Sequence, residues 1–352
     1  MVTEISGQKI EKILVVLLAG LGDMIMASPA IKALRNRFPA AKIDFLVLSQ
    51  NHELAINCPY INEVCVLDRK FNLRAISKNL KTLIRLRKIK FDTAINLYSI
   101  FSFIGAIKIF VLFFLINPKK TIGRNTDGKG FFYNYKILEI LNDSIHQVKR
   151  MLEVVKMLGA KDSGIKLEVW ASQEKHANLE NFLKNNNIYQ EDFIIGINPG
   201  AHRQSHRWPV ENFAILISKL KDCQNAKIVL TGTKGEIGLA KRIKQLSMRE
   251  VFISSGQFSL SDLVNFIKMC KLYITNDTGP MHIANALGIP LVAITGGGPE
   301  KSFPYIKTKT IVLKKDIACW PCFKFYCRRI DCLKAITPEE VKRSSDVLLK
   351  QS

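Results

Sequence analysis

A polar turn directly after an apolar run is the part of this sequence best suited to binding chemistry. Residues 272–274 are apolar, and the turn Asn276-Asp277-Thr278-Gly279 follows before Pro280 opens a helical pattern. A strand that feeds a helix in this way presents unpaired backbone N–H groups and the positive end of the helix dipole, which suits a phosphate group. Asp, Thr and Gly also cap helices, so an ordinary capping turn explains the same residues equally well.

Asp23 is the candidate for acid–base chemistry. It follows the apolar run 13–18 in the segment Ala19-Gly20-Leu21-Gly22-Asp23. A carboxylate just past a strand end can take a proton from an attacking hydroxyl, and capping of the next helix is its alternative role. The glycine fingerprint of dinucleotide sites is incomplete here, which disfavours a nicotinamide enzyme.

A loop rich in cationic side chains follows the apolar run 193–197. It begins with Asn198-Pro199-Gly200 and ends at Trp208-Pro209, where we expect Trp208 to be a packing anchor and Pro209 to open a helix. The cationic side chains of this loop, which can neutralise a diphosphate, are His202, Arg203, His206 and Arg207.

Two more loops of the second half of the chain also follow apolar runs. Glu236 closes the loop 231–236 and can either accept hydrogen bonds from ribose hydroxyls or favour a helix N-terminus. Residues 295–299 form a glycine turn that allows a ligand to approach closely. Four loops in one half of the chain thus carry residues compatible with a nucleotide, and together they favour a nucleotide site more strongly than any one does.

These motifs resemble those of the ADP-heptose lipopolysaccharide heptosyltransferases, a family with the two-domain GT-B fold. The matching residues, in order along most of the chain, are Gly22-Asp23, Asn198-Pro199-Gly200, Arg207-Trp208-Pro209, and Asn276-Asp277-Thr278-Gly279 with His282. The resemblance implies an inverting glycosyltransferase that needs no metal for catalysis. Its substrates would be ADP-heptose and an acceptor sugar of the lipopolysaccharide inner core.

The resemblance also implies a role for each matching residue. Asp23 would be the general base, Asp277 would hold the donor sugar, and Glu236 would bind the ribose. The backbone of Thr278 and Gly279 would hold the diphosphate. Such a set suffices chemically, because the acceptor oxygen attacks the anomeric carbon as the diphosphate leaves.

One position departs from the family pattern. The family usually has a lysine immediately before the Arg/His-Trp-Pro motif, and this chain has His206 there. Histidine can donate to phosphate, but its charge near neutral pH is conditional. Either Arg203 or Arg207 would then supply the fixed cation, or the donor would be another nucleotide sugar.

The elements that must position these residues alternate between strands and helices. This alternation favours an α/β fold with parallel sheets, in which sites lie beyond the carboxyl ends of the strands. A helix is expected after Ser28-Pro29, and another over 73–88. The apolar runs that predict strands are 13–18, 43–48, 93–97, 193–197, 227–230, 272–274 and 291–294.

We therefore expect the GT-B architecture, with two Rossmann-like domains that face a central cleft. The first domain, 1–170, would bind the acceptor. The second, 171–336, would bind the nucleotide sugar and carry a cysteine-rich tail, and residues 337–352 would form a C-terminal helix. A polar region at 171–190 separates the two halves.

The charge and two segments of the first half predict contact with a membrane. The net charge of +22 indicates an anionic partner. Residues 69–90 carry nine basic residues and no acidic one, and helical spacing places the basic side chains opposite an apolar stripe. Residues 100–116 are almost wholly apolar, but Lys108 near their centre would be costly inside a bilayer. A buried helix, or one half-embedded in the cytosolic leaflet, is therefore favoured over a transmembrane span.

The sequence also predicts the cellular location of the protein. The apolar run 13–19 is too short for a signal peptide and lacks a small-residue cleavage site. We expect a cytoplasmic protein, peripheral on the inner face of the inner membrane. Its partners would be the ADP-sugar donor, a lipopolysaccharide core or lipid A-linked acceptor, and the anionic membrane surface.

Four of the eight cysteines gather in the tail. The spacing of Cys319, Cys322, Cys327 and Cys332 matches a compact tetrahedral site for structural zinc or iron. Reduced structural cysteines are the alternative, because the spacing is irregular.

Three other functions fit part of the pattern. Transfer to a protein or another glycan needs the same donor site. A sugar-nucleotide epimerase shares the two-domain architecture, but its small substrate would not need the basic and apolar surface. A nucleic-acid-binding protein fits the charge, but residues 69–90 contain only Phe71 as an aromatic residue on which bases could stack, so we expect no nucleic acid partner.

Overall fold

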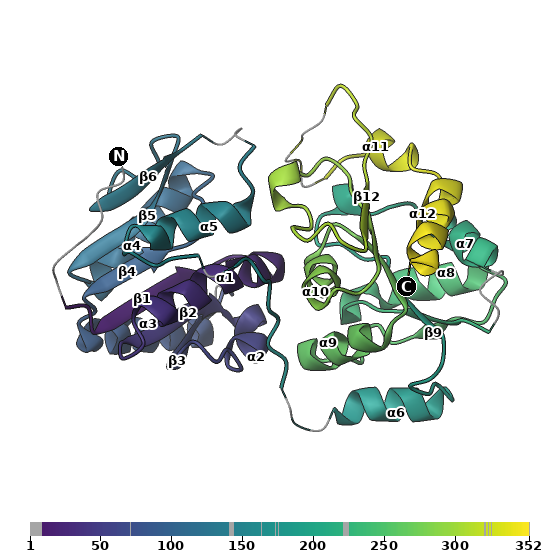
Figure 1. Cartoon of the computed structure of the whole chain (residues 1–352), viewed down its shortest axis with the longest axis horizontal. Coiled ribbons are helices and arrows are strands. Elements are labelled where there is room, and N and C mark those ends of the chain that lie inside the picture. Colours follow the sequence, from purple (N-terminus) through teal and green to yellow (C-terminus); the bar gives the residue numbers. More distant parts are fainter. Residues whose placement is uncertain are drawn as a thin grey trace. The chain divides into compact units, whose positions relative to one another are not determined.

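The computed structural model describes residues 9–70, 72–140, 144–162, 164–172, 174, 176–220, 225–319, 322, 324 and 326–351. The chain divides into two units, Met1–Trp170 and Ala171–Ser352, called here the first unit and the second unit (Figure 1). Each unit is built on one six-stranded sheet whose described strands all pair in parallel.

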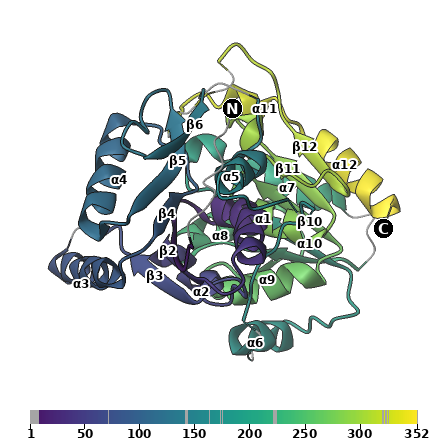
Figure 2. The same cartoon turned by 60° about the vertical axis from the view of Figure 1, so that its left-hand side comes forward.

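The sheet of the first unit has the strand order β3-β2-β1-β4-β5-β6. Helices α1 and α5 pack together on one of its faces, and α3 and α4 lie side by side on the other (Figure 2). The strands are β1 (Lys12–Leu17), β2 (Lys42–Leu48), β3 (Glu63–Leu67), β4 (Thr93–Asn96), β5 (Lys120–Thr126) and β6 (Tyr135–Glu139). The helices are α1 (Leu21–Arg37), α2 (His52–Ala55), α3 (Leu73–Ile89), α4 (Phe103–Ile116) and α5 (Gln147–Lys156).

The second unit repeats this topology, because its strand order β12-β11-β10-β7-β8-β9, taken from the other edge, has the same sequence of crossovers. Helix α7 packs against α8 and α12, and α9 packs against α6 and α10. The strands are β7 (Ile194–Asn198), β8 (Lys227–Leu230), β9 (Phe252–Ile253), β10 (Leu272–Asn276), β11 (Leu291–Ile294) and β12 (Thr310–Leu313). The helices are α6 (Ala177–Asn185), α7 (Val210–Lys219), α8 (Ile237–Leu246), α9 (Leu260–Met269), α10 (Gly279–Leu287), α11 (Asp331–Lys334) and α12 (Pro338–Lys350).

The predicted strands are the ones that the core buries most completely. All seven form, and β4, β7, β10 and β11 are buried along their whole length. Strands covered by helices on both faces consist of continuous apolar runs, which is why the sequence reveals them. The strands that we did not predict, β3, β5, β6, β9 and β12, are shorter, more polar or only half-buried.

Helix α1 begins earlier than predicted. It starts at Leu21, directly after β1, and Pro29 lies inside it instead of preceding it. Pro29 has no N–H to donate to the Ile25 carbonyl four residues back. The Ser28 hydroxyl donates to that carbonyl instead, at 2.7 Å. Because this bond replaces the missing one, the proline does not end the helix, and Asp23 lies in its first turn.

Helices α3 and α4 form as predicted, but they leave apolar side chains in solvent. Helix α3 buries Ala75 and Leu86, while the expected apolar stripe stays largely exposed. Helix α4 is 14 residues long and buries one face only, so of the two expected alternatives it is not the buried helix, and the half-embedded helix stays a prediction. Among the helices of the described residues, none has the length and apolar character needed to cross a membrane. The exposed apolar side chains of the two helices are Leu73, Ile76, Leu80, Ile84, Phe103, Ile104, Ile107, Phe110, Val111, Phe114 and Leu115.

Replacing Ser28 with alanine should lower the free energy of unfolding by about 1–3 kcal/mol. The Ile25 carbonyl would lose its donor, and the Glu168 N–H, which bonds Ser28 Oγ at 2.8 Å, would lose its acceptor. Urea denaturation measures the change. In a Pro29→Ala background an N–H returns at position 29, so Ser28→Ala should cost less there. An equal loss in both backgrounds would contradict the role of Ser28.

Candidate functional site

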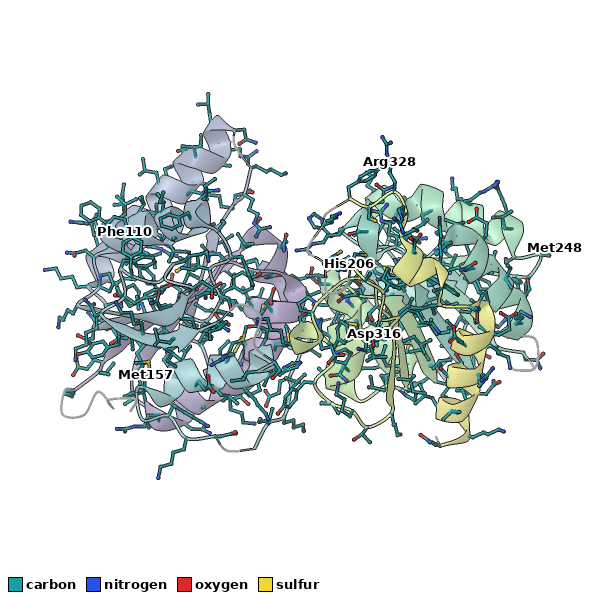
Figure 3. The ribbon with its side chains drawn as sticks, turned by 90° about the horizontal axis from the view of Figure 1, so that it is seen from above. Phe110, Met157, His206, Met248, Asp316 and Arg328 are labelled. Atoms are coloured by element: carbon teal, nitrogen blue, oxygen red, sulfur yellow. The ribbon has the colours of Figure 1, made fainter. Side chains whose placement is uncertain are left out.

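The second unit pairs His206 with Asp277. Asp277 lies in the turn between β10 and α10, and His206 ends the short 3₁₀ turn Gln204–His206 that follows β7. His206 Nδ1 lies 3.2 Å from Asp277 Oδ2, and Figure 3 labels His206 inside the second unit. A carboxylate beside Nδ1 favours the tautomer with the proton on that nitrogen, so in the neutral ring Nε2 is a hydrogen-bond acceptor.

Asn276 ties the loops after β7 and β10 together. Its Oδ1 accepts a hydrogen bond from the Trp208 N–H at 3.2 Å, and its Nδ2 donates to the Pro199 carbonyl at 2.7 Å. Trp208 is buried, stacks edge-on against Phe213, and donates Nε1–H to the Ile336 carbonyl, which confirms the predicted packing anchor. The two loops are therefore held in one fixed arrangement by a buried amide.

Two buried polar atoms of this region have no hydrogen-bond partner among the described residues. They are Asn198 Oδ1 and His206 Nε2, and the two residues are only 4% and 7% exposed. Asn198 Nδ2 donates to Thr278 Oγ1 at 3.1 Å, so Asn198 borders the polar turn before α10. A buried polar atom without a partner costs about 1–3 kcal/mol, a cost that a hydrogen-bonding ligand removes.

The turn before α10 forms the N-terminus of that helix, and its side chain at the N-cap position makes no capping hydrogen bond. Thr278 is the N-cap residue with an extended backbone, and α10 begins at Gly279 with Pro280 in its first turn. The backbone N–H groups of Thr278 and Gly279 lie at the positive end of this helix, where an anion is stabilised. His282 is buried one turn further along the same helix.

Glycines let carboxylates approach the loop backbones. A Cβ added to Gly200 would lie 2.0 Å from Glu236 Oε1, and a Cβ added to Gly298 would lie 2.7 Å from Asp277 Oδ2. Glu236 Oε2 accepts hydrogen bonds from the Thr233 N–H and hydroxyl, so the predicted helix-capping role is present. The second carboxylate oxygen faces Gly200, and the ribose role stays a prediction.

The two arginines expected to supply the fixed cation in place of the family's lysine lie on either side of His206 in the sequence, and that role stays a prediction. Arg207 Nε donates to the Ala201 carbonyl at 2.8 Å and so turns back onto its own loop. Arg203 precedes the 3₁₀ turn and is half-buried. Of these cationic side chains, His206 is the one that lies against Asp277.

Asp23 belongs to the first unit, whereas the other predicted binding residues belong to the second. Its Oδ2 accepts the Gly20 N–H at 3.0 Å, so it caps α1 as the alternative role required. The same bond holds the carboxylate at the carboxyl-end edge of the sheet, a position that is compatible with a base.

A buried arginine near Asp23 was not predicted. Arg124 on β5 is fully buried and lies 3.2 Å from Glu139 and 2.9 Å from Gln147, both through Nη1. Burial lowers the pKa of Arg124, and the carboxylates of Glu139 and Asp23 oppose that shift. Arg124 and Glu139 come from neighbouring strands, so only the sheet order could have revealed the pair.

The predicted metal site does not form among the described residues. No three His, Cys, Asp or Glu side chains in that part of the chain are placed to hold a metal ion. Cys332 is buried in the core of the second unit, while the Cys322 thiol packs against Gly297. The Cys327 thiol accepts the Ile330 N–H, and donation from the Ile330 and Arg329 backbone lowers its pKa. The prediction of structural zinc or iron is therefore not supported by the described residues.

Comparison with known proteins matches the motifs to a family. The profile of glycosyltransferase family 9 (heptosyltransferase) matches residues 80–331. The chain is also 27% identical over 356 residues to lipooligosaccharide heptosyltransferase 2 of Campylobacter jejuni, an alignment that covers 97% of this chain and 99% of that protein.

Two solved structures share the fold. A glycosyltransferase family 9 protein from Veillonella parvula superposes with a TM-score of 0.81 at 24% identity and covers 100% of this chain and 99% of its own. The ADP-heptose lipopolysaccharide heptosyltransferase II of Escherichia coli superposes with a TM-score of 0.72 at 24% identity, covering 97% and 99%. These likenesses confirm the predicted α/β fold of the GT-B class.

Proposed function

Because the chain belongs to glycosyltransferase family 9 (heptosyltransferase), we propose that it transfers a heptose from ADP-heptose to an inner-core lipopolysaccharide acceptor. The names of the similar Campylobacter and Escherichia proteins fit this reaction. The observation that carries the proposal is the hydrogen-bonded group of strand-end loops in the second unit, where Asp277 meets His206 and Asn198 meets Thr278.

The second unit, residues 171–336 with the C-terminal helix packed on it, would bind the donor. The N–H groups of Thr278 and Gly279 hold the diphosphate, and His206 Nε2 donates to it when the ring is protonated. Asp277 holds hydroxyls of the heptose, and Glu236 holds the ribose. His282, on α10, is the remaining residue of the substrate-binding set. Arg203 and Arg207 add positive charge to the loop before α7.

The first unit, residues 1–170, would bind the acceptor and supply the base. Asp23 takes the proton of the acceptor hydroxyl as its oxygen bonds to the anomeric carbon. The bond between that carbon and the diphosphate oxygen breaks at the same time, and the electron pair leaves with ADP. The added charge falls on the diphosphate, which the helix dipole of α10 stabilises. No metal ion takes part in these steps.

Replacing Asp23 with asparagine separates its two roles. The amide oxygen of the new side chain can still accept the Gly20 N–H and cap α1, but the side chain cannot take a proton. We expect kcat for transfer to fall by a factor on the order of 10²–10⁴, with ADP affinity and thermal stability close to wild type. The measurement is ADP release together with mass spectrometry of the core oligosaccharide.

Asp162→Asn is the matched control for this variant. Asp162 is an exposed aspartate of the first unit, which bonds only a neighbouring backbone N–H at Gly164 in the described contacts. Its activity should match the wild type. Retention of wild-type transfer by Asp23→Asn would remove Asp23 from the reaction.

The donor side is tested by Gly200→Ala. The new Cβ would lie 2.0 Å from Glu236 Oε1, so the carboxylate must move away from the loop. We expect the Kd for ADP, measured by calorimetry, to rise at least about tenfold, the loss of roughly 1.4 kcal/mol. Gly238→Ala in α8 is the control, because an added Cβ there meets nothing within 4 Å and should leave ADP affinity unchanged. Normal ADP binding by Gly200→Ala would show that Glu236 does not hold the ribose.

We further propose that the first unit rests on the inner face of the inner membrane through α3 and α4. The exposed apolar side chains of these helices form a surface with aromatic residues, in which Phe110 stacks on Phe114 and contacts Phe131 and Phe132. Figure 3 labels Phe110 within this group. Basic residues of α3, including Arg74 and Lys78, flank it, a combination that binds anionic lipid surfaces.

Co-sedimentation with vesicles tests the membrane proposal. The protein should bind vesicles that contain phosphatidylglycerol, bind neutral phosphatidylcholine vesicles more weakly, and come off in high salt. Phe114→Glu, at a side chain 71% exposed, should weaken binding at least about fivefold, because it places a charge in the apolar surface. Met248→Glu in the second unit is the control, since Met248 is also exposed. Binding that is indifferent to lipid charge would overturn the proposal.

A further inference from the structure

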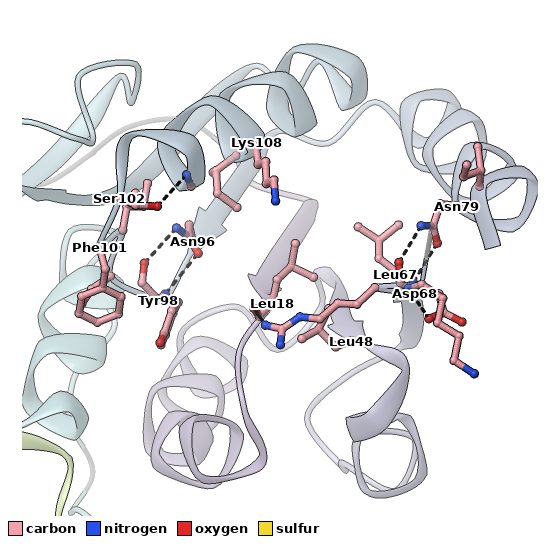
Figure 4. A pocket seen from close by; sticks show the side chains of 17 residues that line it. Leu18, Leu48, Leu67, Asp68, Asn79, Asn96, Tyr98, Phe101, Ser102 and Lys108 are labelled. Atoms are coloured by element: carbon pink, nitrogen blue, oxygen red, sulfur yellow. Dashed lines mark hydrogen bonds between the residues drawn. The ribbon is translucent and has the colours of Figure 1, made fainter. Parts of the chain in front are cut away.

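A cavity of about 660 Å³ opens at the carboxyl-end edge of the first sheet (Figure 4). It reaches Leu18 after β1 and Asn96 at the end of β4, the two adjacent strands at which the strand order reverses. Ligands of open parallel sheets bind at such a reversal point. Its volume lies in the range of small-molecule sites, about 300–1,000 Å³.

The walls of the cavity are mainly apolar. Strand ends supply Leu18, Leu48 and Leu67, while α3 supplies Ile76 and α4 supplies Ile109. Ile76 belongs to the exposed apolar surface of α3, so the cavity is continuous with the surface assigned above to the membrane. Such walls contribute little binding free energy for a sugar alone. A hydrocarbon chain, in contrast, is stabilised by each CH₂ group that the walls remove from water.

The charged residues of the lining are three cations and one acid. The cations are Arg69, Lys70 and Lys108, and Lys108 points from α4 into the cavity (Figure 4). The acid is Asp68, whose Oδ1 accepts the Lys70 N–H at 3.1 Å. Asn79 fixes this turn, since it accepts the Asp68 N–H at 2.8 Å and donates to the Asp68 carbonyl at 2.9 Å.

The charge of the cavity therefore favours an anion. The lining contains three cations and one carboxylate, and Oδ1 of that carboxylate already accepts a hydrogen bond from the backbone of its own turn. Carboxylates and phosphates are the groups that arginine and lysine bind most strongly. Apolar walls with cations among them are complementary to an acidic amphiphile.

We propose that this cavity binds an acyl chain of the acceptor. Arg69, Lys70 and Lys108 bind the acidic groups of the same acceptor. The inference rests on the proposed function and assigns the lipid part of the acceptor to one cavity of the first unit. The acyl chain enters from the exposed face of α3 and α4. The sugar extends along the edge of the sheet where β1 ends and where Asp23 lies.

Acceptor pairs that differ only in acylation test the proposal. The full-length protein is assayed with lipid-linked core acceptor and with the same acceptor after chemical removal of its acyl chains, both monomeric in detergent. Wild-type kcat/KM should be at least about tenfold higher for the acylated acceptor. In Ile76→Trp, which fills the cavity from an exposed helix position, this ratio should fall towards one. Ile56→Trp is the matched control, because Ile56 is 54% exposed against 51% for Ile76 and lies outside the cavity.

A second measurement needs no transfer. Dodecyl phosphate below its micellar concentration should bind the wild-type protein with one-to-one stoichiometry, and dodecanol should bind at least tenfold more weakly. Ile76→Trp and Lys108→Glu should each weaken binding of dodecyl phosphate at least tenfold, whereas Ile56→Trp and Lys161→Glu should not.

The outcomes separate this inference from the proposed function. Equal use of both acceptors by the wild type, or a ratio unchanged in Ile76→Trp, would overturn the acyl site while heptose transfer stands. Binding of dodecyl phosphate without transfer to either acceptor would instead overturn the proposed function.

Discussion

Parallel strand pairing is the constraint on which both candidate sites depend. Because every strand of a sheet points the same way, every loop that leaves a carboxyl end emerges at one edge. In the second unit this gathers the turns after β7, β8, β10 and β11, which lie far apart in sequence, and Asn276 then joins two of them through a buried amide. In the first unit the same constraint brings Asp23, the turn 68–70 and the end of β4 to a single edge.

Polar groups in the core are placed so that most of them have partners. Ser28 supplies the donor that Pro29 lacks, and Arg124 is surrounded by Glu139, Gln147 and the Leu97 carbonyl. Buried side-chain atoms without a hydrogen-bond partner remain at several places among the described residues, Arg124 Nε and Asn51 Oδ1 among them. Asn198 Oδ1 and His206 Nε2 differ from these in their place, because they lie in the strand-end loops, where a bound ligand would recover the cost.

The sequence revealed the buried strands, the strand-end loops and the family, because continuous apolar runs and glycine-rich turns are local signals. It did not reveal the edge strands, whose half-buried residues lack such runs. It also placed the start of α1 too late, because Pro29, a residue typical of a helix start, lies inside this helix. The pairing of His206 with Asp277 needs residues 71 positions apart to meet, and spacing alone could not show it. The cysteine spacing left a metal site and reduced structural cysteines open for the same reason, since spacing does not say whether four sulfur atoms converge. For α4 the sequence left two alternatives open, a buried helix and a half-embedded one, because an apolar stripe has the same pattern whether it faces a core or a lipid.

The exposed face of α4 favours self-association of the purified protein. At about 1.5 Å per residue, its 14 residues extend roughly 21 Å, too short to cross the hydrocarbon core but long enough to present a continuous row of isoleucine and phenylalanine to water. The hydrophobic effect favours removal of these apolar side chains from water, whichever surface covers them. In a lipid-free buffer, the α4 faces of two copies of the chain can therefore cover each other, as a bilayer would cover each of them. The purified protein should therefore form oligomers at high concentration, and a mild detergent should dissociate these oligomers.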